Sequence, residues 1–415
     1  MTEYIVYYKL PSGGYRVCNS NNLEVHGCVR LPEKFSNFQM TKPYDANDNS
    51  LIQYCKDIRI ASDELKKTKE LRGFDYIKPF RKSNGDTFYK THSSNIEAII
   101  NMRKIMNDEH DDIDIIEDKW FKGCFNGGLQ YCKPGTYDCH GYDFSNYYAS
   151  ILGDSNFQIP SKRGQEKTID KFIFKNNLLS ISPGFYHVKI TCDNADVKKC
   201  FNFSKNHVYY SQYLKFAYNE LKDKFNMKFE LILDGEPNAY VYAYKDFVKT
   251  KSIFRYWYDD IVSLKKQLPN ILVKMISSSA WGHLSRRHKK IICENDLSDE
   301  MGYTDDFKYK IIDVCINEDD TLYYKVIDVQ KPYKYNLRLK PFITSYGRIQ
   351  TARIALENLD NVIRIHTDCV VYDKPIDIDK KKYPTFIPEK KTTGLIKFNN
   401  VNNYQKITNE NDLKK

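Results

Sequence analysis

The feature that most restricts the fold of this chain is a helix that leads directly into a β-hairpin. The segment "FITSYGRIQTARIALENL" predicts a helix, and "RIHTDCVVYD", residues 364–373, predicts a strand, a tight turn and a second strand. The turn places Asp368 between Thr367 and Cys369, with His366 two positions before the acid. An acid at a hairpin tip is either an ordinary turn residue or a metal ligand, and the rest of the chain has to decide between them.

The chain as a whole is long enough to bury a core. Its 415 residues are 41% hydrophobic, which predicts two or three domains or lobes. The net charge of +10 suits contact with phosphates. However, the 33 tyrosines and many Lys, Asn and Ile residues are typical of an AT-rich genome, which inflates the lysine count. The charge is therefore weak support for a nucleic-acid partner.

The first residues, "MTEYIVYYKLPSGGYR", do not form a signal peptide, and no later stretch approaches eighteen uninterrupted apolar residues. We therefore expect a soluble intracellular chain with no membrane contact and with reduced cysteines. Cys124, Cys132, Cys139 and His140 lie close together in the sequence. Their spacing does not fit the C-x₂₋₄-C pattern of structural zinc sites, so we interpret them as small buried side chains.

Local patterns predict a mixture of helices and strands. The segment "FKGCFNGGLQYC" predicts strand, glycine turn and strand, and "CHGYDFSNYYASIL" predicts a strand that runs into a helix. Pro269 is expected to end or kink the long helical stretch around it. Further helices are predicted over 48–72, 95–108, 211–225 and 252–282, and a β-rich insertion over 290–340.

Two acids occupy the ends of predicted strands. Asp143 follows one strand, and Asp368 lies at the hairpin tip. Neighbouring strands of one sheet could bring both carboxylates together, as two-metal phosphoryl transfer requires for ions about 3.5–4 Å apart. The alternative is that both are ordinary turn residues.

A basic segment, "KMISSSAWGHLSRR", accompanies this pair. It places Lys274, Ser278 and Trp281 on one face of a helix. A cation, a hydroxyl and an aromatic ring suit a nucleoside triphosphate. The alternative is an amphipathic helix with Trp281 in the core and Lys274 in solvent.

The order of these three segments resembles the family B DNA polymerases. "DFSNYYASIL" resembles the family's D-F-x-S-L-Y-P-S-I-I, "KMISSSAWG" resembles K-x-x-x-N-S-x-Y-G, and "HTDC" resembles the D-T-D-S hairpin. Upstream, "FNGG" resembles the Y-x-G-G loop of the protein-primed members, which helps to seat single-stranded template. The likeness covers roughly residues 120 to 400, and several ordered motifs rarely arise together by chance.

The resemblance implies an α+β fold. This fold is a right-hand polymerase palm, an antiparallel sheet with helices, to which helical fingers, β-rich insertions, a rudimentary thumb and a truncated exonuclease-like region are attached. The implied organisation is 1–115 N-terminal exonuclease remnant, 116–153 template-binding loop and first palm motif, 154–250 insertion resembling the terminal-protein region, with palm, 251–290 fingers, 291–340 second insertion, 341–400 palm with the hairpin, and 401–415 a short tail in place of a full thumb.

The resemblance also implies a function: a nucleotidyltransferase, a DNA-directed DNA polymerase that adds dNTPs to a 3′-OH or protein primer without 3′–5′ proofreading. Asp143, Asp368 and the Phe144 carbonyl would hold two Mg²⁺ ions, and Lys274 would stabilise the leaving pyrophosphate. Tyr148 would stand beneath the sugar and exclude a 2′-OH; its alternative is a core aromatic. The implied nucleotide-binding residues are Tyr148, Lys274, Ser278, Trp281 and Lys266, and the implied DNA contacts are Phe125, Asn126, Gly127, Gly128, Gly282, Thr367 and Lys397.

The implied partners are a DNA primer–template, dNTPs and, if priming uses a protein, a separate terminal protein, in a viral or linear-plasmid setting. Several residues depart from the pattern. His366 replaces the first acid of the hairpin, which suits Mn²⁺ better than Mg²⁺. No D-x-E acid pair occurs in residues 1–60, and little sequence remains for a thumb. Two alternatives therefore stay open: a weakened or inactive polymerase-fold subunit that binds nucleic acid, and a primase-like or repair polymerase.

Overall fold

The computed structural model divides the chain into two compact units, and each is discontinuous in sequence. The first comprises Met1–Asp108 and Lys251–Tyr335, and the second Glu109–Thr250 and Asn336–Lys415. The helices expected over 48–72 and 95–108, and the effect of Pro269, lie outside the described residues. The structure describes strand backbones at 3–9, 15–20, 39–40, 80–81 and 87–88, and residues 110–124, 127–267, 277, 280–287, 289–293, 298–316, 322–333 and 335–408.

The first unit contains two separate β-structures near the N-terminus. Strands β1 (Glu3–Lys9) and β2 (Tyr15–Ser20) form an antiparallel hairpin, and β3 (Gln39–Met40) pairs with the free side of β1. Strands β4 (Phe80–Arg81) and β5 (Thr87–Phe88) form a short antiparallel ladder.

The later part of the first unit is a helix followed by a sheet. Helix α7 (Thr250–Gln267) buries Phe254 and Trp257, whose rings meet edge to face at 5.9 Å. The predicted β-rich character of residues 290–340 is confirmed by four strands. Segments such as "YKIIDVCI" and "LYYKVID" are rich in the β-branched and aromatic residues that favour strands. Its sheet has the order β17 (Lys289–Cys293), β20 (Leu322–Asp328), β19 (Tyr309–Ile316), β18 (Met301–Gly302).

The second unit is built on a seven-stranded sheet in which every neighbouring pair is antiparallel. Its central strand, β7, is ten residues long, so one half pairs with β22 and the other half with β24. Strand β23 pairs with the last residues of β7. The strands are β6 (Gln130–Cys132), β7 (Gly135–Phe144), β21 (Val362–His366), β22 (Cys369–Tyr372), β23 (Phe386–Pro388), β24 (Gly394–Phe398) and β25 (Tyr404–Lys406).

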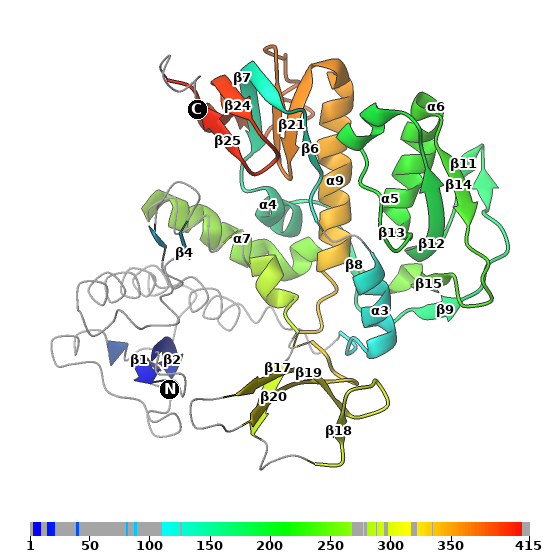
Figure 1. The fold of residues 1–415 in the computed structure, drawn as a ribbon, viewed down its shortest axis with the longest axis vertical. Coiled ribbons are helices and arrows are strands. Elements are labelled where there is room, and N and C mark those ends of the chain that lie inside the picture. Colours follow the sequence, from blue (N-terminus) through cyan, green and yellow to red (C-terminus); the bar gives the residue numbers. More distant parts are fainter. Residues whose placement is uncertain are drawn as a thin grey trace. The chain divides into compact units, whose positions relative to one another are not determined.

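Two helices accompany this sheet. Helix α4 (Tyr147–Asp154) follows β7 after a two-residue turn, and α9 (Lys340–Glu357) precedes the hairpin β21–β22, both as predicted. Figure 1 shows α9 between the sheet and helix α5 (Ser211–Phe216). Residues on all sides of α9 are buried, as expected of a helix enclosed by other elements.

A smaller antiparallel sheet lies on the other side of α9 (Figure 1). Its order is β13 (Val208–Tyr210), β12 (Gly184–Thr191), β15 (Ala239–Val241), β9 (Gln165–Lys167), and β14 (Lys228–Leu231) pairs with β12. The predicted helix over 211–225 is confirmed as α5, a π-helical turn η5 (Ala217–Leu221) and α6 (Lys222–Phe225). Two short ladders also belong to this unit, β8 (Gln158–Pro160) with β16 (Phe247–Lys249) and β10 (Phe174–Lys175) with β11 (Leu178–Leu179). Its 3₁₀ turns include η4 (Ala195–Lys199), η6 (Tyr244–Asp246), η8 (Leu359–Asn361) and η9 (Lys390–Thr392).

One local prediction is wrong: the segment "FKGC" is not a strand. Helix α3 (Ile115–Gly123) includes its first three residues. Asp114 caps this helix, because its side chain accepts a hydrogen bond of 2.9 Å from the Glu117 N–H. Glu117 and Asp118 add two acids to the first turn, where their negative charges interact favourably with the positive end of the helix dipole.

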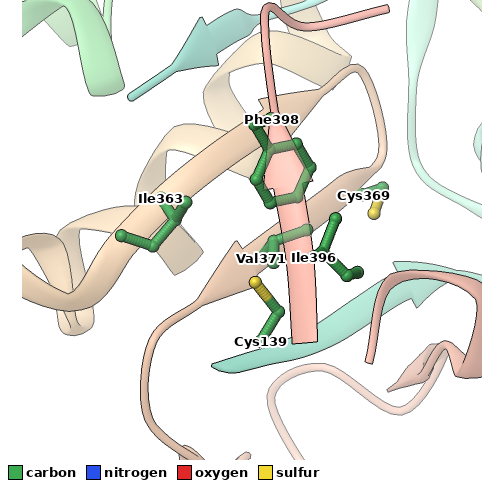
Figure 2. Packing of buried hydrophobic residues seen from close by; sticks show 6 residues of the cluster. All are labelled: Cys139, Ile363, Cys369, Val371, Ile396 and Phe398. Carbon is green, nitrogen blue, oxygen red and sulfur yellow. The ribbon is translucent and has the colours of Figure 1, made fainter. Parts of the chain in front are cut away.

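The core of the seven-stranded sheet includes two cysteines, and one of them, Cys139, belongs to the group considered for a zinc site. Cys139 and Cys369 belong to a cluster with Val371 and Ile396, shown in Figure 2 together with Ile363 and Phe398. Burial raises the pKa of the Cys139 thiol to about 12, and the Asp138 charge adds to this rise. These thiols are therefore neutral packing groups at ordinary pH.

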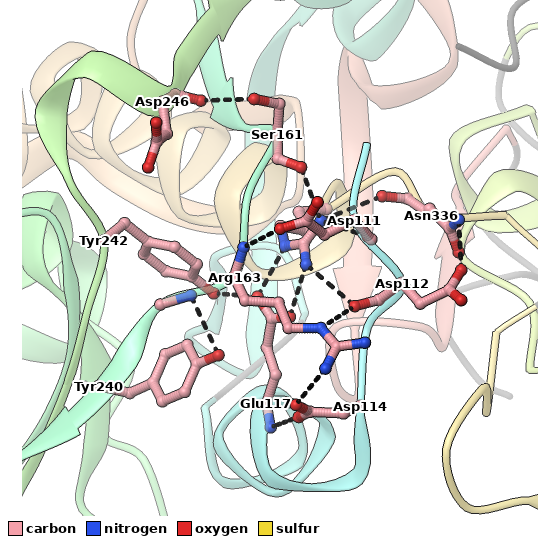
Figure 3. Close-up of polar contacts among 12 residues, drawn as sticks. Asp111, Asp112, Asp114, Glu117, Ser161, Arg163, Tyr240, Tyr242, Asp246 and Asn336 are labelled. Atoms are coloured by element: carbon pink, nitrogen blue, oxygen red, sulfur yellow. Dashed lines mark hydrogen bonds and ion pairs between the residues drawn. The ribbon is translucent and has the colours of Figure 1, made fainter. Parts of the chain in front are cut away.

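A buried ion pair connects α3 to the segment before α9. The Arg338 guanidinium donates to both oxygens of Glu117 at 2.7 and 2.8 Å, and both side chains are 0% exposed. The Tyr242 hydroxyl adds a hydrogen bond of 2.6 Å to Glu117, and Arg338 also donates to the Asp111 carbonyl at 3.0 Å. Figure 3 shows Glu117, Tyr242 and Asp111 within this network. Burial raises the pKa of Glu117, while Arg338 and Tyr242 oppose the rise.

Among the residues that the structure describes, no helix combines the length and the apolar character needed to cross a membrane.

Candidate active site at the end of strands β7 and β22

The two candidate acids lie at the same end of neighbouring strands. Asp143 is the second-last residue of β7, and its backbone partners are Cys369 of β22 and Ile387 of β23. Asp368 directly precedes Cys369, and its carbonyl accepts a hydrogen bond of 3.1 Å from the Phe144 N–H. Hydrogen bonds of the sheet therefore connect the backbone around Asp143 to the backbone around Asp368.

The pKa of the Cys369 thiol reflects the charges of the two neighbouring acids. Burial raises the pKa of the Cys369 thiol to about 12; Asp143 and Asp368 also raise it, and Arg364 opposes them. Both carboxylates thus act on one sulfur atom. In the absence of a metal, Cys369 is a neutral thiol, and its side chain packs in the cluster that contains Cys139, Val371 and Ile396.

The tip of the hairpin has an unusual backbone. His366 and Cys369 are a backbone pair, so Thr367 and Asp368 form the two-residue turn. Thr367 has a φ of 63°, which is uncommon for a β-branched residue. The Asp368 N–H donates to the His366 carbonyl at 2.8 Å, which closes a three-residue turn around Thr367.

Contacts from two other segments hold this tip. The Thr367 N–H donates to the Leu129 carbonyl at 2.8 Å, and the Thr367 carbonyl accepts from the Thr351 hydroxyl at 2.8 Å. A Cβ on Gly128 would lie 2.6 Å from the Thr367 Oγ1, closer than two such atoms can approach. Glycine is needed at 128 because the hairpin packs against it, a reason that does not require a template strand.

Arg348 of α9 connects the same glycine segment to the buried helix. Its guanidinium donates to the Gly127 carbonyl at 2.6 Å and to the Ser345 hydroxyl at 2.9 Å, and it lies 4.4 Å from the centre of the Tyr213 ring. Gly127 and Gly128 are thus placed beside the hairpin. Phe125 and Asn126 lie outside the described residues.

Tyr148 is half-buried on the first turn of α4. Burial and the Asp368 charge raise the pKa of its hydroxyl, and Arg348 opposes them. Gly347 of α9 lets the helix approach this side chain, since an added Cβ would lie 3.3 Å from the Tyr148 ring. The tyrosine therefore lies within electrostatic reach of Asp368 and retains some exposure to solvent.

His366 stands where the family pattern has an acid. Burial and the neighbouring Arg364 lower the pKa of its imidazole, while a hydrogen bond with Asn402 opposes them. The Arg364 guanidinium is itself held by the Val401 carbonyl at 2.8 Å and by the Tyr404 ring at 4.9 Å. The imidazole is therefore neutral at ordinary pH and adds no positive charge beside the acids.

The remaining candidate residues belong to other segments of the sequence. Lys397 is half-buried on β24, where its backbone pairs with Thr136 and Gln405. Lys266, Trp281 and Gly282 belong to the first unit: Lys266 is exposed near the end of α7, and Trp281 and Gly282 are half-buried in a helical turn over 280–284. Lys274 and Ser278 lie outside the described residues.

The described residues contain no group of three or more His, Cys, Asp or Glu side chains that could hold a metal ion. Within the described part of the chain, Asp143 and Asp368 are two carboxylates at neighbouring strand ends. Mg²⁺ is commonly held by one or two carboxylates together with substrate phosphates, rather than by a complete protein cage. The donor set fits a metal that is shared with a phosphorylated substrate.

Sequence patterns did not identify Thr351 or Arg348, although both contact the segments that carry the candidate site. The available signal was a series of polar residues within a helix that the hairpin prediction already placed next to the site. Helical periodicity alone does not show which of them reach outwards.

A scan against protein-family models finds no match, and a search of curated proteins also finds none. Solved structures of Phi29 DNA polymerase are similar to this chain. The complex with primer-template DNA (post-translocation binary complex) has a TM-score of 0.49 at 14% identity, over 93% of this chain and 62% of that chain. The complex with single-stranded DNA has a TM-score of 0.48 at 13% identity, again over 93% and 62%. The ternary complex with incoming nucleotide has a TM-score of 0.47 at 13% identity, over 76% and 55%. The chain spans between 55% and 62% of the length of these structures.

Proposed function

We propose that this chain is a template-directed DNA polymerase, which adds deoxynucleotides to a 3′-OH or a protein primer by metal-dependent phosphoryl transfer. The observation that carries the proposal is the placement of Asp143 and Asp368 at the same end of β7 and β22. The sheet register and the Phe144–Asp368 backbone bond hold these acids next to each other. Two carboxylates so placed suit the binding of divalent cations between protein and phosphate.

In this proposal, Asp143, Asp368 and the Phe144 carbonyl hold Mg²⁺. Mn²⁺ is the alternative ion, suggested by the histidine that stands at 366 in place of an acid. Bound metal lowers the pKa of the attacking hydroxyl and neutralises charge on the triphosphate. The two carboxylates supply the negative charge that retains the cations. The neighbouring Cys369 contributes packing and no charge.

Other residues would bind the substrates. Tyr148, within the field of Asp368, would lie beneath the sugar and select deoxynucleotides. Lys274 would stabilise charge on the leaving pyrophosphate. The support for this role is the resemblance of "KMISSSAWG" to the family motif. Ser278, Trp281 and Lys266 would complete the nucleotide site, and Phe125, Asn126, Gly127, Gly128, Gly282, Thr367 and Lys397 would contact DNA.

Priming by a separate terminal protein is the finer part of the proposal. Its support is the "FNGG" segment, residues 125–128, whose described part lies against the hairpin tip. A loop packed on the catalytic hairpin is well placed to direct a template strand towards the same carboxylates.

Primer extension on a single-stranded template tests the proposal, with Mg²⁺ or Mn²⁺ and with Asp368→Asn as the test variant. Asp360→Asn is a matched control, because it removes the same charge at an exposed position just before β21. We expect the wild type and Asp360→Asn to extend the primer and Asp368→Asn to lose extension. No incorporation by the wild type with either metal, while DNA binding is retained, would rule out the enzyme.

A second candidate function is a polymerase-fold subunit that binds nucleic acid without catalysis. The observation that favours it is His366, because a neutral imidazole leaves only two carboxylates at the strand ends. A primase-like or repair polymerase on the same sheet would instead give short products in the same extension assay.

A further inference from the structure

Thr351 of α9 directs its hydroxyl away from its own helix. A threonine within a helix often donates to the carbonyl four residues earlier. Thr344 does so, since its hydroxyl donates to the Lys340 carbonyl at 2.8 Å. Thr351 instead donates to the Thr367 carbonyl at the hairpin tip, also at 2.8 Å.

The reason for this difference lies in α4. The carbonyl four residues before Thr351 belongs to Gly347, and it accepts a hydrogen bond of 2.6 Å from the Tyr147 hydroxyl. The helical bond from the Thr351 N–H takes its other lone pair. With both lone pairs occupied, the single proton of the Thr351 hydroxyl is available to the hairpin. The two hydroxyl oxygens themselves lie 3.3 Å apart.

The Thr367 carbonyl belongs to the peptide plane that ends at the Asp368 nitrogen. The Asp368 N–H of this plane donates to the His366 carbonyl at 2.8 Å, and the Thr351 hydroxyl holds its other side. A peptide plane fixed at both its N–H and its C=O cannot rotate. This plane fixes the position of the Asp368 Cα, so the Thr351 hydroxyl restrains the residue that carries the candidate metal ligand.

We propose that Thr351 and Tyr147 are positioning residues that act together. Tyr147 occupies the Gly347 carbonyl, and Thr351 thereby holds the hairpin tip that carries Asp368. Tyr147 is four residues from Asp143, so the pair couples the segments of the two acids through α9. The proposal rests on Asp368 as a metal ligand, which is part of the proposed function.

The first test measures Mn²⁺ affinity of the full chain by electron paramagnetic resonance, a readout that does not depend on catalysis. Thr351→Val removes the hydroxyl and keeps the β-branched shape. Asp368→Asn should abolish the Mn²⁺ binding of this site. We expect Thr351→Val to weaken the same binding by about tenfold or more. Thr351→Ser keeps the hydroxyl and should restore the affinity. Thr344→Val removes a buried hydroxyl from the same helix and should leave the affinity unchanged.

Hydrogen exchange of peptides covering residues 362–372 gives a second readout. Exchange should be faster in Thr351→Val than in the wild type or in Thr344→Val. Tyr147→Phe frees the Gly347 carbonyl for Thr351, so it should also weaken Mn²⁺ binding. The double variant Tyr147→Phe/Thr351→Val should bind no more weakly than Thr351→Val alone.

The proposal would be overturned if Thr351→Val changed neither the Mn²⁺ affinity nor the hydrogen exchange of residues 362–372. It would also be overturned if the losses of Mn²⁺ affinity from Tyr147→Phe and Thr351→Val multiplied in the double variant. A loss in Thr351→Ser as large as in Thr351→Val, or no Asp368-dependent Mn²⁺ binding by the wild type, would do the same. If the wild type binds Mn²⁺ through Asp368 but does not extend a primer, the proposed polymerase function fails and the positioning role of Thr351 remains.

Discussion

At the scale of single residues, Thr367 has a strained backbone conformation that hydrogen bonds stabilise. A β-branched residue at a φ of 63° costs on the order of 1–3 kcal/mol. Hydrogen bonds to Leu129 and from Thr351, each contributing about 1 kcal/mol, offset that cost. The sequence showed the acid at the hairpin tip. It could not show the positive φ, because nothing in "HTDC" requires it locally.

Gly128→Ala tests the close packing of the glycine segment on this tip. The added Cβ would meet the Thr367 Oγ1, Cγ2 and Cα at 2.6 to 2.9 Å. We expect the free energy of unfolding to fall by about 1–3 kcal/mol, measured by urea denaturation.

Thr367→Gly in the same background provides the control. It removes two of the three clashing atoms and relieves the positive-φ strain, so it should restore part of the lost stability. If the losses from Gly128→Ala and Thr367→Gly simply add, the two residues are not in the contact described.

At the scale of elements, local patterns were sufficient where one element carries its own signal. The helix over α9, the strand–helix of β7 and α4, and the hairpin β21–β22 follow from periodicity and turn residues. The strand prediction at "FKGC" was wrong. It gave weight to the aromatic and glycine residues of this segment and overlooked the helix cap at Asp114, which begins α3. Contacts between elements, such as Arg348 with Gly127, depend on packing that no local pattern contains.

The ion pair between α3 and the segment before α9 gives a prediction at this scale. Replacing Arg338 or Glu117 alone by Met leaves one buried charge without its partner. Each single variant should lower the free energy of unfolding by about 3–5 kcal/mol.

The double variant Glu117→Met/Arg338→Met leaves no unpaired charge. It should therefore lose less stability than the sum of the two single variants, measured in a double-mutant cycle by urea unfolding. A double loss equal to that sum would show that the two side chains do not stabilise each other.

At the scale of the whole molecule, the second unit is assembled from two distant parts of the sequence, and buried thiols lie throughout it. Burial raises the pKa of Cys200 to about 12, opposed by Lys224 and Lys199. Burial also raises the pKa of Cys124 to about 11. The seven-stranded sheet takes β6 and β7 from the first part and its other strands from the second. Local sequence patterns therefore could not establish that β7 pairs with β22.

These thiols predict loss of stability at alkaline pH. A thiol with a raised pKa in the folded state contributes its full stability below the unfolded pKa of about 8.5–9. That contribution is lost as pH rises towards the folded value, at about 1.4 kcal/mol per pH unit for each thiol. Urea midpoints measured under reducing conditions should fall steeply above about pH 9. Cys200→Ala should make the fall shallower, and an unchanged slope would contradict a buried neutral thiol at this position.

The central claim is that Asp143 and Asp368 form one metal-dependent nucleotidyl-transfer site. The most direct measurement is the rate of incorporation of a single deoxynucleotide with Mg²⁺ or Mn²⁺, in the wild type, Asp143→Asn, Asp368→Asn and the double variant. Residues that act as a unit have non-additive effects, so each single variant should lose about as much activity as the double variant. Incorporation that survives either single substitution, or losses that multiply in the double variant, would contradict the claim.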